Sequence, residues 1–352
     1  MSGAVLVTGA TGFLGRHVLA ALAEVLPDTR AVALVRDRDS SGALDAATLG
    51  AGVIEGHLED SERWGTDPAL AECDGVVHLA GLVRHSRRDP AASFRTNVTG
   101  TQEMVRLAAR LGCRLVAVST SGAVGCSRDP SAAPDEEAPF ADHVVGDWPY
   151  YASKIAAERG GRALAGVLDV DLVVLRPPVL LGPGDRGGRS TSILRRMRRR
   201  SPLILGGGYH FADVRDVARA VVAALRHPHP HPVYHLPGWN GTQAEFAHLI
   251  AEAEGRHAHP VRVPFAVAHI AARLLSSFGR FVDPVVVEMG RHHWNVVAHH
   301  SAHDLDYRSR DPRMTLRDAI ASLERGATGG ASPAAPATPA SRAPAPRARR
   351  AS

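Results

Sequence analysis

A tyrosine and a lysine stand four residues apart in the chain, at Tyr150 and Lys154. Residues at this spacing share one face of a helix, so both side chains can reach a single ligand. A phenol has a pKa of about 10, which a nearby ammonium or a positively charged nicotinamide ring would lower. Tyr151 has no such partner, because Ile155 stands four residues after it. Alone, the pair would fit an ordinary exposed helix. With the glycine-rich turn described below, it predicts acid/base chemistry at Tyr150, tuned by Lys154.

Three hydroxyl side chains follow the apolar run 116–118: Ser119, Thr120 and Ser121. If this run is a strand of a parallel sheet, they lie at its carboxyl end, where such sheets place their ligands. A hydroxyl there can bind a substrate oxygen as negative charge develops on it. We expect Ser121 to play this role, with Thr120 as the second candidate and Ser119 satisfying nearby backbone groups. All three also suit an ordinary turn.

The first apolar run, Ala4–Thr8, leads into a glycine-rich turn that opens a helix. Its GxxGxxG spacing allows a tight turn, a close approach of pyrophosphate to the backbone, and close packing of helix against strand. The pyrophosphate would lie at the helix N-terminus, where free N–H groups favour negative charge. A turn without a ligand is the alternative, but strand, motif and helix follow in the order that dinucleotide binding requires. The expected contacts are Gly9, Thr11, Gly12, Phe13, Leu14 and Gly15.

The end of the second expected strand indicates which nicotinamide cofactor binds. An acidic residue there accepts hydrogen bonds from a free 2′-hydroxyl, whereas an arginine accommodates a 2′-phosphate. Arg36 stands at this strand end and Asp37 follows it. The sequence therefore favours NADP(H), with NAD(H) as the alternative if Asp37 turns inward and Arg36 is only a solvated surface charge.

Short β-branched runs alternate with helical stretches through the first two-thirds of the chain, the pattern of βαβ units and a parallel sheet. This pattern predicts an α/β fold: a Rossmann doubly wound parallel sheet with a smaller C-terminal α+β substrate domain. The expected strands are Ala4–Thr8, Ala31–Val35, Gly52–Glu55, Gly75–Leu79, Arg114–Ser119 and Asp171–Arg176, and the expected helices are Gly12–Leu26, Pro90–Leu111 and Tyr150–Ala165. We place the dinucleotide-binding domain at 1–179 and 210–238, the substrate-binding domain at 180–209 and 239–325, and a disordered Ala/Pro/Arg-rich tail at 326–352.

Composition excludes several other classes of protein. The three cysteines fit neither a zinc site nor a disulfide framework, and the N-terminus has no signal-peptide pattern, so we expect a cytoplasmic protein. No apolar run is long enough to span a bilayer, and Val261–Phe278 is expected to form an amphipathic helix packed on the protein. The formal charge of +5 is concentrated in Arg195–Arg200 and the tail, which argues against nucleic-acid binding. That arginine run suits a phosphate-bearing ligand or a solvated helix face. The histidine clusters lack the spacing of a catalytic metal site, so no metal is expected.

Together these motifs resemble the extended short-chain dehydrogenase/reductase family, of the NAD-dependent epimerase/dehydratase type, from about Val5 to Leu323. The chain looks most similar to the dihydroflavonol-reductase-like and 3β-hydroxysteroid-dehydrogenase-like members. The stretches that carry the resemblance are 8–15, 78–81, 96–101, 119–122, 150–154, 176–177, 182–185 and 211–218.

The resemblance implies a Ser/Thr–Tyr–Lys active centre, in which Tyr150 is the acid/base and Lys154 tunes it. It implies that Asn97 supports a proton-relay water, although a buried structural role suits an asparagine equally. The further cofactor contacts that it implies are His57, Leu58, Leu79, Ala80, Gly81, Asn97, Lys154, Pro177 and Val179. The family commonly has Gly-Asp-Leu where this chain has Gly56-His57-Leu58, which puts the adenine contact in doubt. A homodimer is also typical of the family.

The expected enzyme is an NAD(P)-dependent oxidoreductase that reduces a carbonyl of a small organic substrate, or oxidises the alcohol, by hydride transfer with tyrosine acid/base catalysis. An NAD-dependent nucleotide-sugar epimerase is the alternative with the same active centre. A non-catalytic nicotinamide sensor is disfavoured because Tyr150, Lys154 and Ser121 are all present. A 4,6-dehydratase is disfavoured because Ser121 and Gly122 stand where such enzymes have an Asp-Glu pair. The substrate itself is not encoded in any readable motif.

Overall fold

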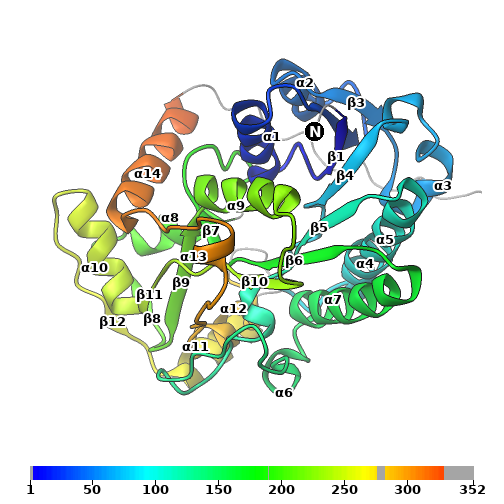
Figure 1. Cartoon of the computed structure of the whole chain (residues 1–352). Helices are drawn as coiled ribbons and strands as arrows, with labels where there is room; N and C mark the ends of the chain where they lie inside the picture. Colours follow the sequence, from blue (N-terminus) through cyan, green and yellow to red (C-terminus); the bar gives the residue numbers. More distant parts are fainter. Residues whose placement is uncertain (1–2, 189, 276–281, 329–352) are drawn as a thin grey trace, which may run out of the picture.

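A computed structural model describes residues 3–188, 190–275 and 282–328 of the chain. Its main feature is a seven-stranded sheet in the order β10-β6-β5-β4-β1-β2-β3 (Figure 1). Every neighbouring pair in this sheet is parallel. The strands are β1 (Ala4–Thr8), β2 (Arg30–Val35), β3 (Gly52–Glu55), β4 (Cys73–His78), β5 (Arg114–Val118), β6 (Leu172–Arg176) and β10 (Val233–His235). The first strand, β1, lies inside the sheet, and the strand order reverses between β1 and β4, which is where such folds bind ligands.

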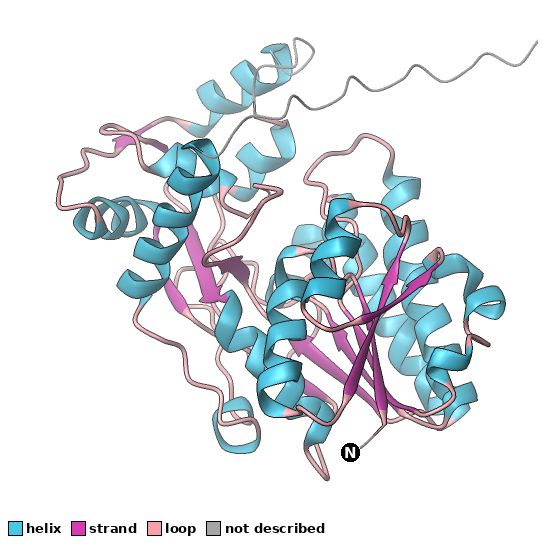
Figure 2. Ribbon diagram, turned by 90° about the horizontal axis from the view of Figure 1, so that it is seen from above, coloured by secondary structure: helices cyan, strands magenta, loops and turns pink. Residues whose placement is uncertain are grey.

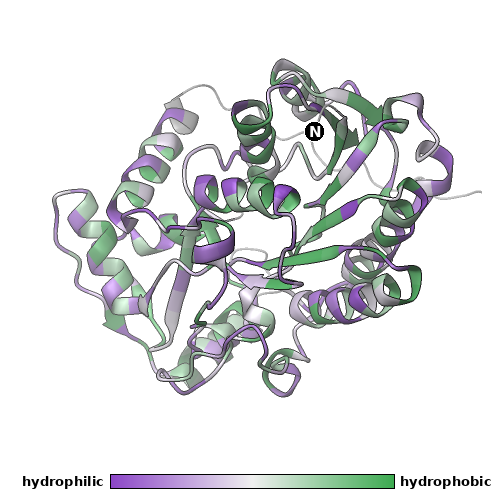
Figure 3. Cartoon of the chain, in the orientation of Figure 1, coloured by the Kyte–Doolittle hydropathy of each residue, from purple (hydrophilic) through white to green (hydrophobic). Residues whose placement is uncertain are grey.

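Helices cover both faces of this sheet (Figure 2). Along β1, Val5 and Val7 belong to the core beneath α1 and α9, whereas Leu6 belongs to the core on the opposite face, which α5 covers. Because both faces are buried, the strand is apolar from Ala4 to Val7. Figure 3 shows the green of apolar residues along these central strands. The helices of this lobe are α1 (Phe13–Val25), α2 (Ser41–Thr48), α3 (Ser61–Trp64), α4 (Pro90–Phe94), α5 (Gly100–Leu111), α6 (Asp142–Val145), α7 (Pro149–Leu168) and α9 (Val214–Arg226). The predicted Rossmann fold is confirmed.

The remaining elements form a smaller lobe with its own core, built from α8, α10, α14 and the strands beside them. A three-stranded sheet has the order β11-β9-β7, and β12 pairs with β8. Its strands are β7 (Val179–Leu181), β8 (Leu203–Ile204), β9 (Gly208–Asp213), β11 (Trp239–Thr242) and β12 (Val261–Arg262); its helices are α8 (Ser192–Met197), α10 (Gln243–Ala253), α11 (Phe265–Leu275), α12 (Pro284–Met289), α13 (Ser301–Asp304) and α14 (Pro312–Thr328).

Two predicted boundaries need correction. Residues 210–213, assigned above to the dinucleotide-binding domain, belong to β9 and therefore to the small sheet; the chain returns to the large sheet only with α9. Helix α14 continues to Thr328, so residues 326–328 of the predicted tail are helical. The rest of that tail, 329–352, lies outside the described residues.

The single helix predicted over Pro90–Leu111 is interrupted. Helix α4 ends at Phe94, a wide π-turn occupies Arg95–Thr99, and α5 begins at Gly100. Such widened turns place one extra residue in the helix and occur often at functional sites. Here the turn contains Asn97, one of the predicted site residues.

Helix α11 forms within the segment 261–278 that was expected to be an amphipathic helix, of which residues 276–278 lie outside the described part. It buries only Ala272, and the apolar side chains of Val267, Ile270 and Leu274 are exposed. Within the described residues, no helix is both long enough and apolar enough to cross a bilayer. The three cysteines are free thiols, so no disulfide links the elements.

Candidate active site

The glycine-rich turn between β1 and α1 is packed too closely for side chains at two of its glycines. Gly9 has a φ of +70°, and a side chain there would overlap the backbone of Leu79 and Ala80. A β-carbon on Gly15 would overlap the carbonyl oxygen of Gly9. Gly12 caps α1 without a side-chain hydrogen bond, and the first turn of the helix has no acidic residue. The free N–H groups at this helix end therefore suit a pyrophosphate.

The residues at the end of β2 take separate roles. Asp37 accepts the backbone N–H of Asp39 at 2.9 Å, and its backbone oxygen accepts the hydroxyl of Ser40 at 2.7 Å, so this carboxylate shapes the turn into α2. Arg38 donates to the backbone oxygen of Val53 at 3.1 Å. Arg36 is exposed and has no side-chain partner in the described part of the chain. Its guanidinium is therefore available to a group bound beyond the strand end.

The predicted contacts after β3 and β4 line the loops at the same sheet edge. His57 is exposed, whereas Leu58 is half-buried against the core under α5. After β4, the Leu79 N–H donates to the Thr8 backbone oxygen at 3.1 Å and the Ala80 N–H to the Thr8 hydroxyl at 3.3 Å. Gly81 is exposed. These bonds hold the β4 loop beside the glycine-rich turn.

Asn97 connects that loop to α7. Its Oδ1 accepts the Leu82 N–H at 2.7 Å, and its Nδ2 donates to the Ser153 hydroxyl at 2.9 Å. The Ser153 hydroxyl in turn donates to the backbone oxygen of Tyr150 at 2.7 Å. The Asn97 side chain is only 1% exposed, and both its polar atoms are used within the protein. This geometry favours the structural role among the two considered above.

Tyr150 lies in the first turn of α7, where its phenol is close enough to the Thr120 hydroxyl for that hydroxyl to affect its pKa. Burial raises the pKa of Tyr150 to about 12, and the nearby Thr120 hydroxyl opposes this rise. Thr120 caps the short turn that follows β5, and its hydroxyl also accepts the Gly122 N–H at 3.3 Å. The structure thus brings together the predicted phenol and the second of the two hydroxyl candidates.

The first candidate, Ser121, lies next to Thr120 but is only 1% exposed. Its backbone N–H donates to the Pro177 oxygen at 2.9 Å, which ties the β5 loop to the segment after β6. Pro177 is buried, and Val179 is 40% exposed at the start of β7, in the small sheet.

Lys154 is the only lysine in a chain that carries 41 lysine and arginine residues in total. The other 40 of these residues are arginines, whose planar guanidinium group stays charged and is larger than an ammonium group. The Lys154 ammonium donates to the Val118 backbone oxygen at 2.7 Å, at the end of β5. Burial lowers the pKa of Lys154 to about 8, and the charge of Glu158 one turn later opposes this shift. Position 154 therefore has a compact cation that can lose its proton more readily than a free lysine can.

A cavity of about 20 Å³ lies beneath Lys154, lined in part by His78, Thr101, Ser119 and Glu158. Its volume and polar lining suit a single water molecule. Ser119 was expected to satisfy backbone groups, and this expectation is wrong: its buried hydroxyl has no hydrogen-bond partner within the described residues. His78 donates to or accepts from the Thr8 hydroxyl at 2.8 Å, and burial lowers the pKa of His78 to about 3. The imidazole is therefore neutral.

An aromatic wall, which sequence reasoning missed, stands beside Tyr150. The ring of His85 meets the Tyr150 ring edge-on, with centroids 5.2 Å apart, and lies parallel to that of Tyr151 at 5.9 Å. The Trp294 ring also stacks on that of Tyr151, with centroids 5.3 Å apart. Burial, together with the charge of Arg196, lowers the pKa of His85 to about 4, and its Nδ1 is buried without a partner among the described residues. No local sequence signal marks these residues, because they meet only in the fold.

The histidine clusters contain one candidate metal site. Within the described residues, one grouping has a plausible set of metal ligands: His231, His300 and Asp304, whose ligand atoms lie within 4.8 Å of one another. Asp304 already accepts the Tyr234 hydroxyl at 2.9 Å. None of these contacts involves Tyr150 or Lys154.

Comparison with known proteins agrees with this geometry. Residues 5–236 match the NAD dependent epimerase/dehydratase family. A 4-hydroxy-2-methyl-3-oxo-4-farnesyl-3,4-dihydroquinoline-1-oxide ketoreductase of Stigmatella aurantiaca is 31% identical over 79% of this chain and 81% of its own length. A putative dihydroflavonol 4-reductase of Synechocystis is 30% identical over 60% of each chain, so that match spans less than two thirds of the relative.

Two solved structures have the same fold as this chain. The crystal structure of gox2253 superposes with a TM-score of 0.77 and 26% identity, covering 92% of this chain and 98% of that one. The UDP-glucose 4-epimerase of Thermotoga maritima has the same fold, with a TM-score of 0.69 at 22% identity, over 92% of this chain and 99% of that one. The chain belongs to the NAD-dependent epimerase/dehydratase family and is an NAD(P)-dependent oxidoreductase of the extended short-chain dehydrogenase/reductase type.

Proposed function

We propose that this enzyme reduces a carbonyl of a small organic substrate with NADPH. The observation that carries the proposal is the position of Tyr150 beside the Thr120 hydroxyl at the carboxyl edge of the sheet, one helical turn from the chain's only lysine. The site has a proton donor, a hydroxyl for the substrate oxygen, and a cation. The relatives that are named reductases support the same direction of chemistry.

The residues divide the work as follows. When bound, the nicotinamide cofactor would supply the hydride for the carbonyl carbon. Thr120, or Ser121 beside it, donates a hydrogen bond to the carbonyl oxygen while negative charge develops there. Tyr150 then gives its phenolic proton to that oxygen, which completes the alcohol. The Lys154 ammonium stabilises the phenolate that remains, because an opposite charge nearby favours the ionised form.

The preference for NADPH rests on Arg36. This side chain has no partner in the described residues, whereas Asp37 is held in the turn before α2. A 2′-phosphate would offer Arg36 a charge-assisted, bidentate contact that a 2′-hydroxyl does not. The aromatic wall of His85, Tyr151 and Trp294 supports an apolar or aromatic substrate next to Tyr150.

Epimerisation of a nucleotide sugar is the second candidate. It is supported by a UDP-glucose 4-epimerase of Azospirillum brasilense, which is 30% identical over 63% of this chain and 68% of its own length. The same Tyr150 and Lys154 would serve that reaction. The two functions differ in how the cofactor is held, because an epimerase keeps its NAD through the whole cycle.

The test is steady-state oxidation of NADPH with a panel of aromatic and alicyclic ketones, beside UDP-glucose. We expect turnover of at least one ketone, and its loss in Tyr150→Phe with NADPH affinity unchanged. Thr120→Val and Ser121→Ala distinguish the two hydroxyls, and we expect the first to lower kcat more, by about 100-fold. NAD retained through purification, or UDP-glucose epimerised in the absence of any ketone turnover, would contradict the proposal.

A further inference from the structure

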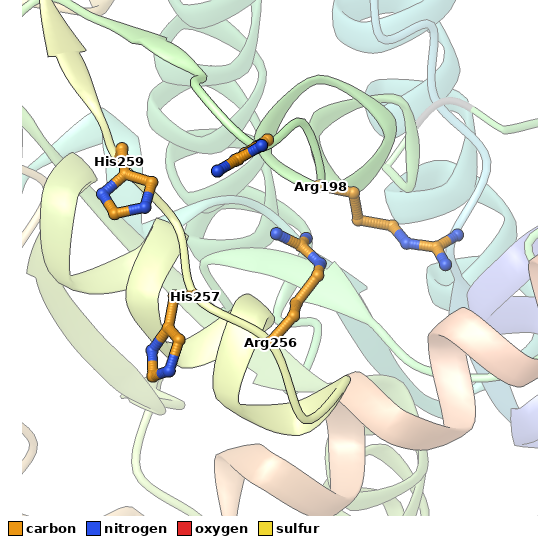
Figure 4. A pocket seen from close by; sticks show the side chains of 5 residues that line it. Arg198, Arg256, His257 and His259 are labelled. Atoms are coloured by element: carbon orange, nitrogen blue, oxygen red, sulfur yellow. The ribbon is translucent and has the colours of Figure 1, made fainter.

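Part of the arginine run 195–200 lines a second cavity, which shares no lining residue with the cavity beneath Lys154. The cavity has a volume of about 420 Å³ and is lined by Arg198, Arg200, Arg256, His257 and His259 (Figure 4). It lies where the end of α8 meets the segment between α10 and β12. In Figure 1, α10 and α7 are on opposite sides of the molecule, so this is not the active site. All five lining residues are basic or imidazole side chains.

Two of these arginines are held in place from behind by Glu254. Arg198 donates to Oε1 of Glu254 from Nε at 2.8 Å and from Nη2 at 2.5 Å. Arg256 donates to Oε2 from Nε at 2.9 Å and from Nη2 at 2.6 Å. A further bond runs from Nη2 of Arg198 to Glu324 at 2.7 Å. Guanidinium groups fixed in this way lose little conformational entropy when they bind a ligand.

Two donor groups on the same cavity are unused. Nη1 of Arg256 is buried and has no hydrogen-bond partner within the described residues. Arg200 is exposed and makes no side-chain bond there either. A buried guanidinium N–H without an acceptor is costly, and such groups in native proteins are generally satisfied by a water or an ion. Glu254 and Glu324 offset two of the three arginine charges, which leaves Arg200 and both histidines without a carboxylate partner.

The backbone holds the two segments together. The His259 N–H donates to the Arg200 oxygen at 2.8 Å, and the Val261 N–H to the Pro202 oxygen at 2.9 Å. The pairing continues in the short parallel ladder between β12 and β8. The cavity is therefore a fixed feature between two tied segments, unlike a row of independent side chains on a solvated helix face.

We propose that this cavity binds a phosphorylated small molecule. Phosphate carries close to two negative charges and three acceptor oxygens, and arginine forks match it in a bidentate geometry. A volume of about 420 Å³ exceeds that of a single phosphate group and leaves room for an organic body beside the rings of His257 and His259. The ligand would satisfy Nη1 of Arg256 and reduce the repulsion between Arg200 and Arg256. The proposal is independent of the reaction at Tyr150.

Isothermal titration calorimetry with pyrophosphate tests this site. The protein is first saturated with NADPH, so that pyrophosphate cannot bind at the glycine-rich turn. We expect one pyrophosphate per chain, and Arg200→Ser should weaken its binding by about 10- to 100-fold through the loss of one charge-assisted contact. Because the Arg200 side chain has no hydrogen-bond partner among the described residues, this substitution should leave the folded structure intact. Arg219→Ser is the matched control, since Arg219 of α9 forms an exposed ion pair with Glu24 of α1.

The source of the phosphate is tested separately by sedimentation with vesicles. Phosphatidylcholine vesicles that contain phosphatidic acid are compared with phosphatidylcholine alone, for the wild type and Arg200→Ser. Binding of pyrophosphate without vesicle binding supports a soluble ligand, and vesicle binding that Arg200→Ser abolishes assigns the phosphate to a lipid headgroup. Equal weakening by Arg200→Ser and Arg219→Ser, which would show general charge attraction, overturns the proposal. So does the absence of binding to either probe.

Discussion

Replacing Lys154 with methionine should stabilise the nucleotide-free protein at neutral pH. Burial lowers the pKa of Lys154 from 10.5 to about 8, and this drop corresponds to about 3 kcal/mol. The folded protein bears this cost at pH 7, because the charge is held where it is poorly solvated. Methionine has similar length and no charge, but it loses the bond to the Val118 oxygen, about 1 kcal/mol. The net gain should be about 2 kcal/mol.

The lowered pKa of Lys154 also determines how the stabilisation by Lys154→Met changes with pH. Between pH 8 and 10.5 the unfolded chain holds the Lys154 proton more tightly than the folded protein does. The contribution of Lys154 to the free energy of unfolding therefore rises with pH across that window. The destabilisation caused by burying its charge is fully present only below about pH 8. The stabilisation by Lys154→Met should accordingly be largest at pH 7 and disappear near pH 10.5, where only the lost hydrogen bond remains.

Urea unfolding of the wild type and Lys154→Met at pH 7 and pH 10 measures this difference. Arg219→Met, which removes an exposed cation of α9, is the control and should change stability by less than about 0.5 kcal/mol. Because the chain has one lysine, protein labelled with ¹³C-lysine gives one lysine side-chain signal, whose titration reports the pKa of Lys154 directly. A signal that titrates near 10.5, or a less stable Lys154→Met at pH 7, would refute the reasoning.

Three further predictions concern the cofactor site and the core. Arg36→Ser should weaken NADPH binding by about tenfold and leave NADH binding unchanged, as fluorescence titration would show; equal effects on both would argue against a 2′-phosphate contact. Gly15→Ala should abolish the thermal stabilisation by NADPH, because its methyl group overlaps the Gly9 oxygen, while circular dichroism shows an intact fold. Arg176→Met should lower the free energy of unfolding by about 3–5 kcal/mol in urea, because it leaves the buried Glu158 carboxylate, 2.5 Å from Arg176 in the wild type, without its partner. Adding Glu158→Gln to this variant should restore part of the loss. If it restores none, the pairing is contradicted.

The strands and the phosphate turn could be predicted because their signals are local. A β-branched run such as Ala4–Thr8 and the glycines that follow it are determined by backbone conformation and burial on both faces. The bounds of β1 and β3 match the prediction residue for residue. The break within 90–111 was missed because the sequence there keeps a helical pattern, while the bonds of Asn97 to Leu82 and Ser153 come from outside the helix.

The details of the site depend on contacts that sequence spacing does not contain. Neighbouring hydroxyls at Thr120 and Ser121 look equivalent in the sequence, and only the position of α7 decides which one meets Tyr150. Likewise, His85 and Trp294 are far apart in the chain, yet both pack against Tyr151. Such contacts are set by the packing of the two lobes and leave no periodic pattern in either segment.

The central claim is that a dinucleotide bound across the start of α1 reaches Lys154 and Tyr150. The most direct measurement is a titration of ¹³C-lysine-labelled protein with NADPH, observed at the one lysine signal. Because Lys154 is one of the expected cofactor contacts, the account predicts a shift of this signal that saturates together with the rise in melting temperature. Saturable NADPH binding that leaves the Lys154 signal unmoved would show that the cofactor ends elsewhere, and would contradict the account.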